Sequence, residues 1–175
     1  VTDTAGAVAS ELSATGDELD EANDVNVVGG TIDVAAADAV QDITRYDAVD
    51  SGYVIEDSAG SVLGDTGTIL DSGVAHVDVN SIASANVGVA LGGLEDALEA
   101  GYSSDISFTV SDDASDIALL GGQDTIVDSG VDQVFVTDSS VDAGVGVQLS
   151  SLEGRLLDET VNGDTANINF TVTDS

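Results

Sequence analysis

The chain of 175 residues lacks cysteine, methionine, proline, tryptophan and lysine altogether. Without cysteine it can form no disulfide, use no thiol nucleophile and bind no zinc through thiolates. Only three tyrosines and three phenylalanines supply aromatic bulk, which indicates a thin core. Because Val1 is not a start residue, we expect an internal or processed segment, with any signal peptide removed or outside it.

Basic residues are almost absent, since only Arg45 and Arg155 oppose 34 acids and the formal net charge is −32. Nucleic-acid binding needs a basic surface, so it is excluded as a function. The same charge opposes docking on an anionic membrane, and no apolar run approaches the roughly 20 residues of a span. Such a surface repels itself unless cations screen it, so we expect a saline or calcium-containing exterior.

The apolar fraction of 42% is high enough to bury a core, so the charge does not indicate disorder. Most of the acid is aspartate, a poorer helix former than glutamate and a better cap and turn residue. The acid should therefore gather in loops and at helix starts.

A short pattern recurs along the chain: an aromatic residue, alternating apolar positions, then aspartate, a second polar residue and alanine. It reads YVIEDSA at 53–59, FTVSDDA at 108–114 and FTVTDS at 170–175, and the chain opens in the same phase with VTDTA. The alternation predicts a half-buried strand, and the polar pair offers an N-cap to a helix that begins at alanine. Gly64 and the pair 121–122 predict that this helix is short in the later copies.

Two further patterns lie between these. LDSGVAHVDV at 70–79 matches VDSGVDQVFV at 127–136, and VGVALGGLE at 87–95 matches VGVQLSSLE at 145–153. Residues 74–79 and 131–136 are predicted second strands, each followed by a second helix. Val87, Leu91, Leu94 and Leu98 share one face of that helix, and Gly101 should end it. The first copy is looser, with a strand-like part at 25–28 and a helix-like part at 34–49.

These patterns predict an α/β protein, a repeat-built, solenoid-like stack of strand–helix–strand–helix units with parallel strands. The predicted units are 1–52, 53–107 and 108–169, with 170–175 as the first strand of a following unit. A compact α/β sandwich and a β-rich sandwich with short helices are the alternatives.

The strand–helix repeat with its Asp-Ser/Thr-Ala turn resembles tandem repeats of very long secreted bacterial cell-surface proteins. That resemblance implies an extracellular adhesin stalk, surface layer or filament, of a type often exported by type I machinery. Some such proteins carry calcium-binding Gly-Asp repeats. Here residues 121–124 are an isolated fragment of that pattern, which argues against a β-roll calcium site.

Calcium is the ligand that the acidic clusters favour, because it takes six to eight oxygen ligands. The candidate ligands are Asp17, Asp20, Asp24, Asp112, Asp113 and Asp116. Residues 162–164 form a third acidic loop, and no loop matches the EF-hand. The alternative for each cluster is helix capping on a solvated acidic surface.

We expect no enzymatic activity. His76 is the only histidine, it has no Gly-x-Ser-x-Gly partner motif, and the next copy has Gln133 in its place. Paired acids could hydrolyse glycosides, but the chain has no tryptophan platform for a sugar. Asn169 fits an N-glycosylation sequon, which is weak evidence on its own.

The sequence thus predicts an extracellular structural segment of a self-assembling filament, sheath or surface layer in a saline environment. The alternative is a spacer in a calcium-stabilised adhesin. The expected partners are copies of the chain itself, head to tail, and other surface components, with no nucleic acid and no membrane insertion.

Overall fold

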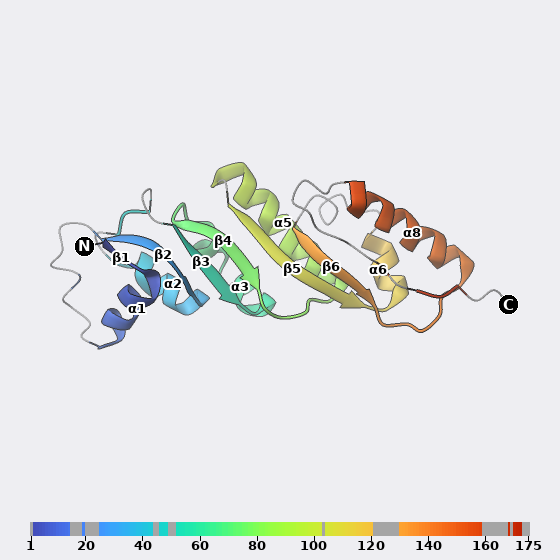
Figure 1. The fold of residues 1–175 in the computed structure, drawn as a ribbon, viewed down its shortest axis with the longest axis horizontal. Coiled ribbons are helices and arrows are strands. Elements are labelled where there is room, and N and C mark those ends of the chain that lie inside the picture. The colour runs from blue at the N-terminus through green and yellow to red at the C-terminus, as the bar shows by residue number, and fades with distance from the viewer. Residues whose placement is uncertain are drawn as a thin grey trace. The chain divides into compact units, whose positions relative to one another are not determined.

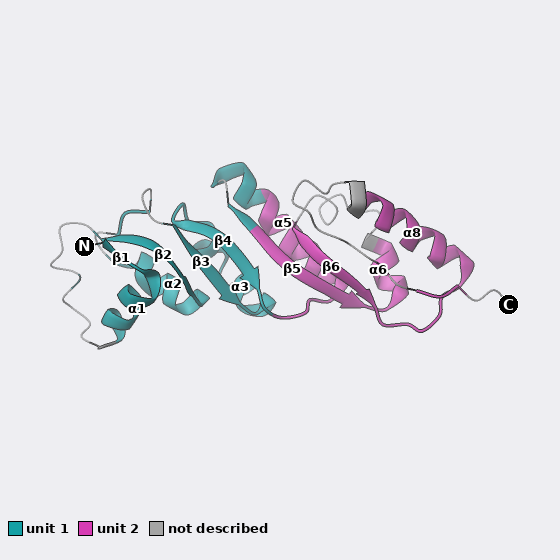
Figure 2. Ribbon diagram, in the orientation of Figure 1, with its two compact units in different colours: residues 1–80, 97–105 teal, residues 81–96, 106–175 magenta. Residues whose placement is uncertain are grey.

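The structure is a computed structural model that describes residues 2–14, 19, 25–43, 46–48, 52–102, 104–120, 130–158, 168 and 170–172 (Figure 1). The chain divides into two compact units (Figure 2). Unit 1 comprises residues 1–80 and 97–105, and unit 2 comprises 81–96 and 106–175. Each unit alternates strands with helices.

Unit 1 contains four parallel strands that pair in chain order. They are β1 (Thr2–Asp3), β2 (Asn26–Ile32), β3 (Gly52–Asp57) and β4 (Val74–Val79). Helices follow the first three strands: α1 (Ala5–Ala14), α2 (Val34–Gln41), α3 (Ala59–Gly64) and the short α4 (Thr66–Ile69). Because parallel strands need crossover connections, the intervening helices are a requirement of this topology.

Unit 2 contains the parallel pair of β5 (Asp105–Asp112) and β6 (Val131–Val136). Its helices are α6 (Ala114–Leu120), α8 (Ala143–Asp158) and most of α5 (Ala85–Gly101). A parallel bridge joins Ala83 to Val110, and a second joins Val141 to Val172. The segment that contains Val172 thus takes the place beside Val141 that β5 takes beside Ala83.

The predicted repeat is present in the backbone pairing. The β3–β4 and β5–β6 pairs share one register, and both shift after the first position: Tyr53/Val74 with Phe108/Val131, Val54/His76 with Thr109/Gln133, and Asp57/Val79 with Asp112/Val136. The flanking hydrogen bonds also correspond. The N–H groups of Asn80 and Thr137 donate to the carbonyls of Asp57 and Asp112 at 3.0 and 2.9 Å. The sequence matches therefore reflect equivalent three-dimensional positions.

The core of each unit lies between its strands and helices. Tyr53 and Phe108 are buried at equivalent strand positions. In α5 the predicted apolar face packs inward, with Leu91, Leu94 and Leu98 buried. In β5 the first six residues alternate between unburied and buried positions, so one face of the strand packs on the helices.

The expected α/β class with parallel strands is confirmed, and the β-sandwich alternative is not what the chain forms. Strands 74–79 and 131–136 have the predicted bounds, α3 ends at Gly64, and α5 ends at Gly101. Residues 121–122 lie outside the described residues, and the predicted division into three repeat units remains a prediction.

The first copy corrects the expectation in two places. The helix expected over 34–49 ends at Gln41, because Tyr46 forms a parallel bridge with Val25 and Asp47 donates its N–H to the Val25 carbonyl at 2.9 Å. The strand expected at 25–28 continues to Ile32 past Gly29 and Gly30, whose φ angles of 70° and 93° accompany a register shift.

The Gly130→Ala variant should lose stability, because Gly130 has φ of 47° and an added Cβ would overlap the carbonyl oxygen of Ile106. We expect a loss of about 2 kcal/mol or more in the free energy of unfolding, measured by urea denaturation. Gly93→Ala is the control, because Gly93 is exposed in α5 with open space around its Cβ. It should gain about 0.5–1 kcal/mol. Equal effects of the two variants would contradict the described backbone conformation of Gly130.

Candidate functional site

Aspartates gather where strands end and helices begin. The first N–H groups of a helix have no partner within the helix, and its N-terminus favours negative charge. Ser58 caps α3 by accepting from Ser61 N–H at 3.2 Å, and Asp33 caps α2 by accepting from Ala36 N–H at 2.7 Å. The cap predicted before Ala59 is therefore confirmed, and Asp33 is a cap that the sequence analysis did not predict.

A second set of aspartates connects successive elements, and we call Asp57, Asp112 and Asp138 the linking aspartates. Each accepts, through Oδ2, the first N–H of the helix that precedes its strand. The donors are Val34 to Asp57 (3.2 Å), Ala85 to Asp112 (2.9 Å) and Ala114 to Asp138 (2.6 Å). The bond spans 23, 27 and 24 residues of sequence.

Two of the linking aspartates use both oxygens. Asp57 Oδ1 accepts from Ser58 N–H at 2.6 Å, and Asp112 Oδ1 accepts from Asp113 N–H at 2.9 Å. Each of these carboxylates thus contacts two helix starts at once. Its charge-assisted hydrogen bonds satisfy N–H groups that have no acceptor within the helix. In the pairs Asp57-Ser58 and Asp112-Asp113, the first residue therefore links two elements and the second residue caps a helix.

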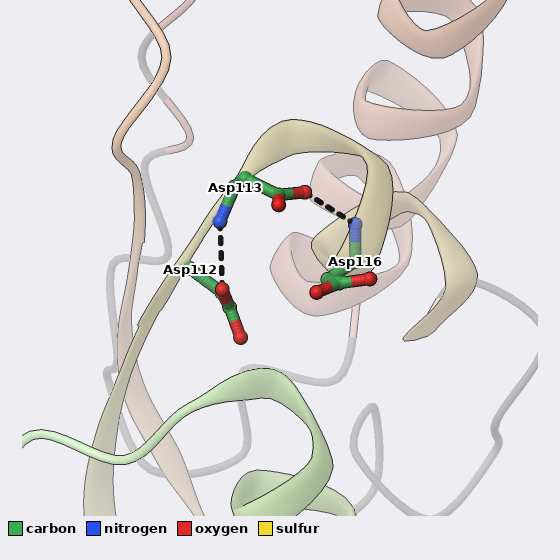
Figure 3. Close-up of side chains that lie close together, drawn as sticks. All are labelled: Asp112, Asp113 and Asp116. Carbon is green, nitrogen blue, oxygen red and sulfur yellow. Dashed lines mark hydrogen bonds between the residues drawn. The ribbon is translucent and has the colours of Figure 1, made fainter.

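The strongest candidate for a metal site is the triad Asp112, Asp113 and Asp116 at the start of α6 (Figure 3). One carboxylate oxygen from each lies within 4.8 Å of the others. Asp116 N–H donates to Asp113 Oδ1 at 3.0 Å, and the Ser115 hydroxyl donates to the same oxygen at 2.7 Å. The triad therefore combines capping with a local concentration of negative charge.

The charges within the triad act on one another. The Ser115 hydroxyl and the Asp116 N–H hold the pKa of the Asp113 carboxyl below its usual value. The Asp113 carboxylate, and to a lesser extent that of Asp112, raises the pKa of Asp116. A divalent cation would relieve this repulsion, but both oxygens of Asp112 already accept backbone N–H groups.

Next to the triad, an open pocket of about 270 Å³ lies at the starts of α6 and α8. Asp113, Asp138 and Asp142 line it together with Ser115 and Ser140. Asp142 Oδ1 caps α8 by accepting from Val145 N–H at 2.9 Å. The lining is acidic and open to solvent, so it can attract cations, and it offers little apolar surface to an organic substrate.

The only histidine, His76, has an acidic neighbour that the sequence did not indicate. Its Nδ1 lies 2.6 Å from Asp105 Oδ1, and the two side chains are 33% and 56% exposed. An ion pair this exposed contributes at most about 1 kcal/mol. The register confirms that Gln133 takes the equivalent position in β6.

The remaining sequence candidates cannot be placed. Asp17, Asp20 and Asp24, the loop at 162–164, the fragment 121–124 and Asn169 lie outside the described residues. Of the six predicted calcium ligands, the structure brings Asp112, Asp113 and Asp116 together. The linking role of Asp57 and Asp138 was missed, although the recurrence of Asp57 as Asp112 was a signal that could have found it.

Comparison of the chain with protein-family models, with curated proteins and with solved structures found no match. Among the described residues, every helix is too short or too polar to cross a lipid bilayer.

A pair of reciprocal variants tests the linking aspartates. Asn80 and Thr137 make equivalent bonds, so Ser81 takes the position of Asp138. Asp138→Ser should lower the free energy of unfolding by about 1 kcal/mol, because a neutral acceptor replaces a charged one at Ala114 N–H. Ser81→Asp should raise it by a similar amount by offering a carboxylate to the start of α3. Urea denaturation at moderate salt measures both, and effects of the same sign would contradict the equivalence.

Proposed function

We propose that this chain is a structural segment of an extracellular filament, sheath or surface layer that works in a saline environment. The observation that carries the proposal is the repetition of one strand–turn–helix geometry along the chain. Ala83 N–H donates to the Thr109 carbonyl at 2.8 Å, and Val141 N–H donates to the Thr171 carbonyl at 2.9 Å. Such repetition is typical of arrays in which each step packs on the next.

The surface supports the same proposal. The linking and capping aspartates accept hydrogen bonds from backbone N–H groups, so their carboxylates have a structural role. Large apolar side chains are nevertheless exposed in unit 2, with Leu119 and Val147 each 71% exposed and Phe135 49% exposed. A passive spacer should be acidic all round, whereas a self-assembling protein needs apolar lateral contacts. These side chains favour assembly.

The alternative function is a spacer of a calcium-stabilised bacterial adhesin. The triad of Asp112, Asp113 and Asp116 favours it, because calcium bound there would join the end of β5 to the start of α6. With one ligand oxygen from each carboxylate, the triad supplies three of the six to eight oxygens that calcium takes, so water would complete the shell. This predicts weak binding, in the range of extracellular modules.

Self-assembly is tested by size-exclusion chromatography with light scattering, at high salt with and without calcium. We expect a mass that rises with protein concentration, because salt screens the charge of −32 and leaves the apolar contacts. The double variant Leu119→Ser/Val147→Ser should shift the protein toward monomer. Gln148→Ser, an exposed polar neighbour on α8, is the control and should assemble like the parent. A parent mass independent of concentration would reject the assembly proposal and leave the spacer.

Calcium binding is tested with Asp116→Asn, because Asp116 is the triad member whose pKa the neighbouring charges raise. Isothermal titration calorimetry should give a Kd of about 10⁻⁴–10⁻³ M for the parent and at least a severalfold weaker value for the variant. Asp96→Asn, in the exposed part of α5, removes one charge outside the triad and should bind like the parent. Identical isotherms for all three proteins would show that the triad only caps α6.

A further inference from the structure

We propose that Asp57 is an acid-sensitive latch that fastens the start of α2 to the end of β3 and releases it when protonated. This inference does not depend on the proposed function. The latch consists of one carboxylate and two backbone donors, Val34 N–H to Oδ2 and Ser58 N–H to Oδ1. Both bonds need acceptor oxygens, and a protonated carboxyl would turn one of them into a donor.

This carboxylate connects two successive elements through a hydrogen bond between residues that are 23 positions apart in the chain. Val34 is the first residue of α2, and Asp57 is the last residue of β3. Ser58 is at once the neighbour of Asp57 and the N-cap of α3. Protonation of one side chain therefore weakens the starts of two helices together.

Lysine and arginine are absent from the elements described around the latch, and the one histidine of β4, His76, lies opposite Val54 and pairs with Asp105. Asp33 precedes α2, Glu56 belongs to the same strand, and Asp78 lies opposite Glu56 on β4. The residues of α3 carry no titratable group. The Asp57 carboxylate therefore depends on its hydrogen bonds, because the charged side chains beside it, Asp33, Glu56 and Asp78, are acidic.

The pKa of the Asp57 carboxyl decides whether acid strengthens or weakens the latch. Its partial burial raises the pKa, but the N–H groups of Ser58 and Val34 and the hydroxyls of Ser61 and Ser58 outweigh that effect, so the pKa is lowered from 3.8. A carboxyl with a lowered folded-state pKa contributes stability that is complete above its unfolded pKa. That contribution is lost as the pH falls through the folded value.

A second effect acts in the opposite direction. Protonating the many exposed acids reduces self-repulsion, which stabilises the folded chain as the pH falls. The effect of the latch is therefore measured as the difference in stability between the parent and a variant of Asp57, because the other acids titrate in both proteins. Asp57→Asn keeps the size of the side chain but removes its charge and its titration.

The test measures unfolding by urea between about pH 7 and about pH 2 for the parent, Asp57→Asn and the control Asp78→Asn, which removes an exposed charge on the neighbouring strand. At pH 7 the folding equilibrium constant of Asp57→Asn should be about tenfold lower than that of the parent. The difference should shrink as the pH falls and vanish in strong acid. Asp78→Asn should differ from the parent by less than about twofold throughout.

Nuclear magnetic resonance of the unaltered protein tests the latch without any variant. The Val34 amide shift should follow the titration of the Asp57 carboxyl, and the Ala36 amide should follow Asp33, its own acceptor. A Val34 amide that follows Asp33, or an Asp57→Asn difference that stays constant with pH, would overturn the proposal.

Discussion

The structure depends on one interaction: a carboxylate at the end of a strand that accepts the first N–H of the preceding helix. In a parallel α/β arrangement every strand end is near a helix start, and every helix start has unpaired N–H groups. Asp57, Asp112 and Asp138 satisfy those donors across 23 to 27 residues of chain. This hydrogen bond recurs because the same arrangement of helix start and strand end recurs along the chain.

This use of aspartate gives a physical reason for a composition that otherwise opposes folding. A net charge of −32 destabilises a compact chain by self-repulsion. Where a carboxylate accepts two backbone N–H groups, however, its charge stabilises the fold. Asp57 and Asp112 each accept two such groups. As helix caps, Asp33, Asp113 and Asp142 each accept the N–H of a residue in the first turn. Aspartates that bind the elements together therefore also contribute to the repulsion between negative charges at the ends of the strands.

The copies that begin at Tyr53 and at Phe108 share their backbone pairing but differ in side-chain chemistry. Tyr53 and Phe108 fill equivalent buried positions, yet only Tyr53 brings a hydroxyl, which accepts from Gln41 Nε2 at 2.7 Å. The copy that begins at Phe108 has Asp113 and Asp116 where the copy that begins at Tyr53 has Ser58 and Ser61, so of these two copies the former alone has the acidic triad. The backbone register is shared, while the side-chain chemistry at each position is specific to its copy.

Local pattern was sufficient for much of the fold. The alternation at 74–79 and 131–136, the capping pairs before Ala59 and Ala114, and the leucine spacing in α5 each depend on residues close in sequence. The end of α2 was mispredicted because the bridge between Val25 and Tyr46, a contact between distant residues, takes over after Gln41. The extension of β2 past Gly29 and Gly30 likewise depends on pairing with β3.

The sequence by itself determined the repeat, the parallel α/β class and the charge, because propensity, periodicity and composition are local or additive properties. It could also name Asp112, Asp113 and Asp116, which are close together in one helix start. Only the tertiary structure decided that Asp57 binds Val34, that Asp138 binds Ala114 and that His76 meets Asp105. Those contacts join residues 23 to 29 positions apart, and strand register, which no single segment encodes, brings them together.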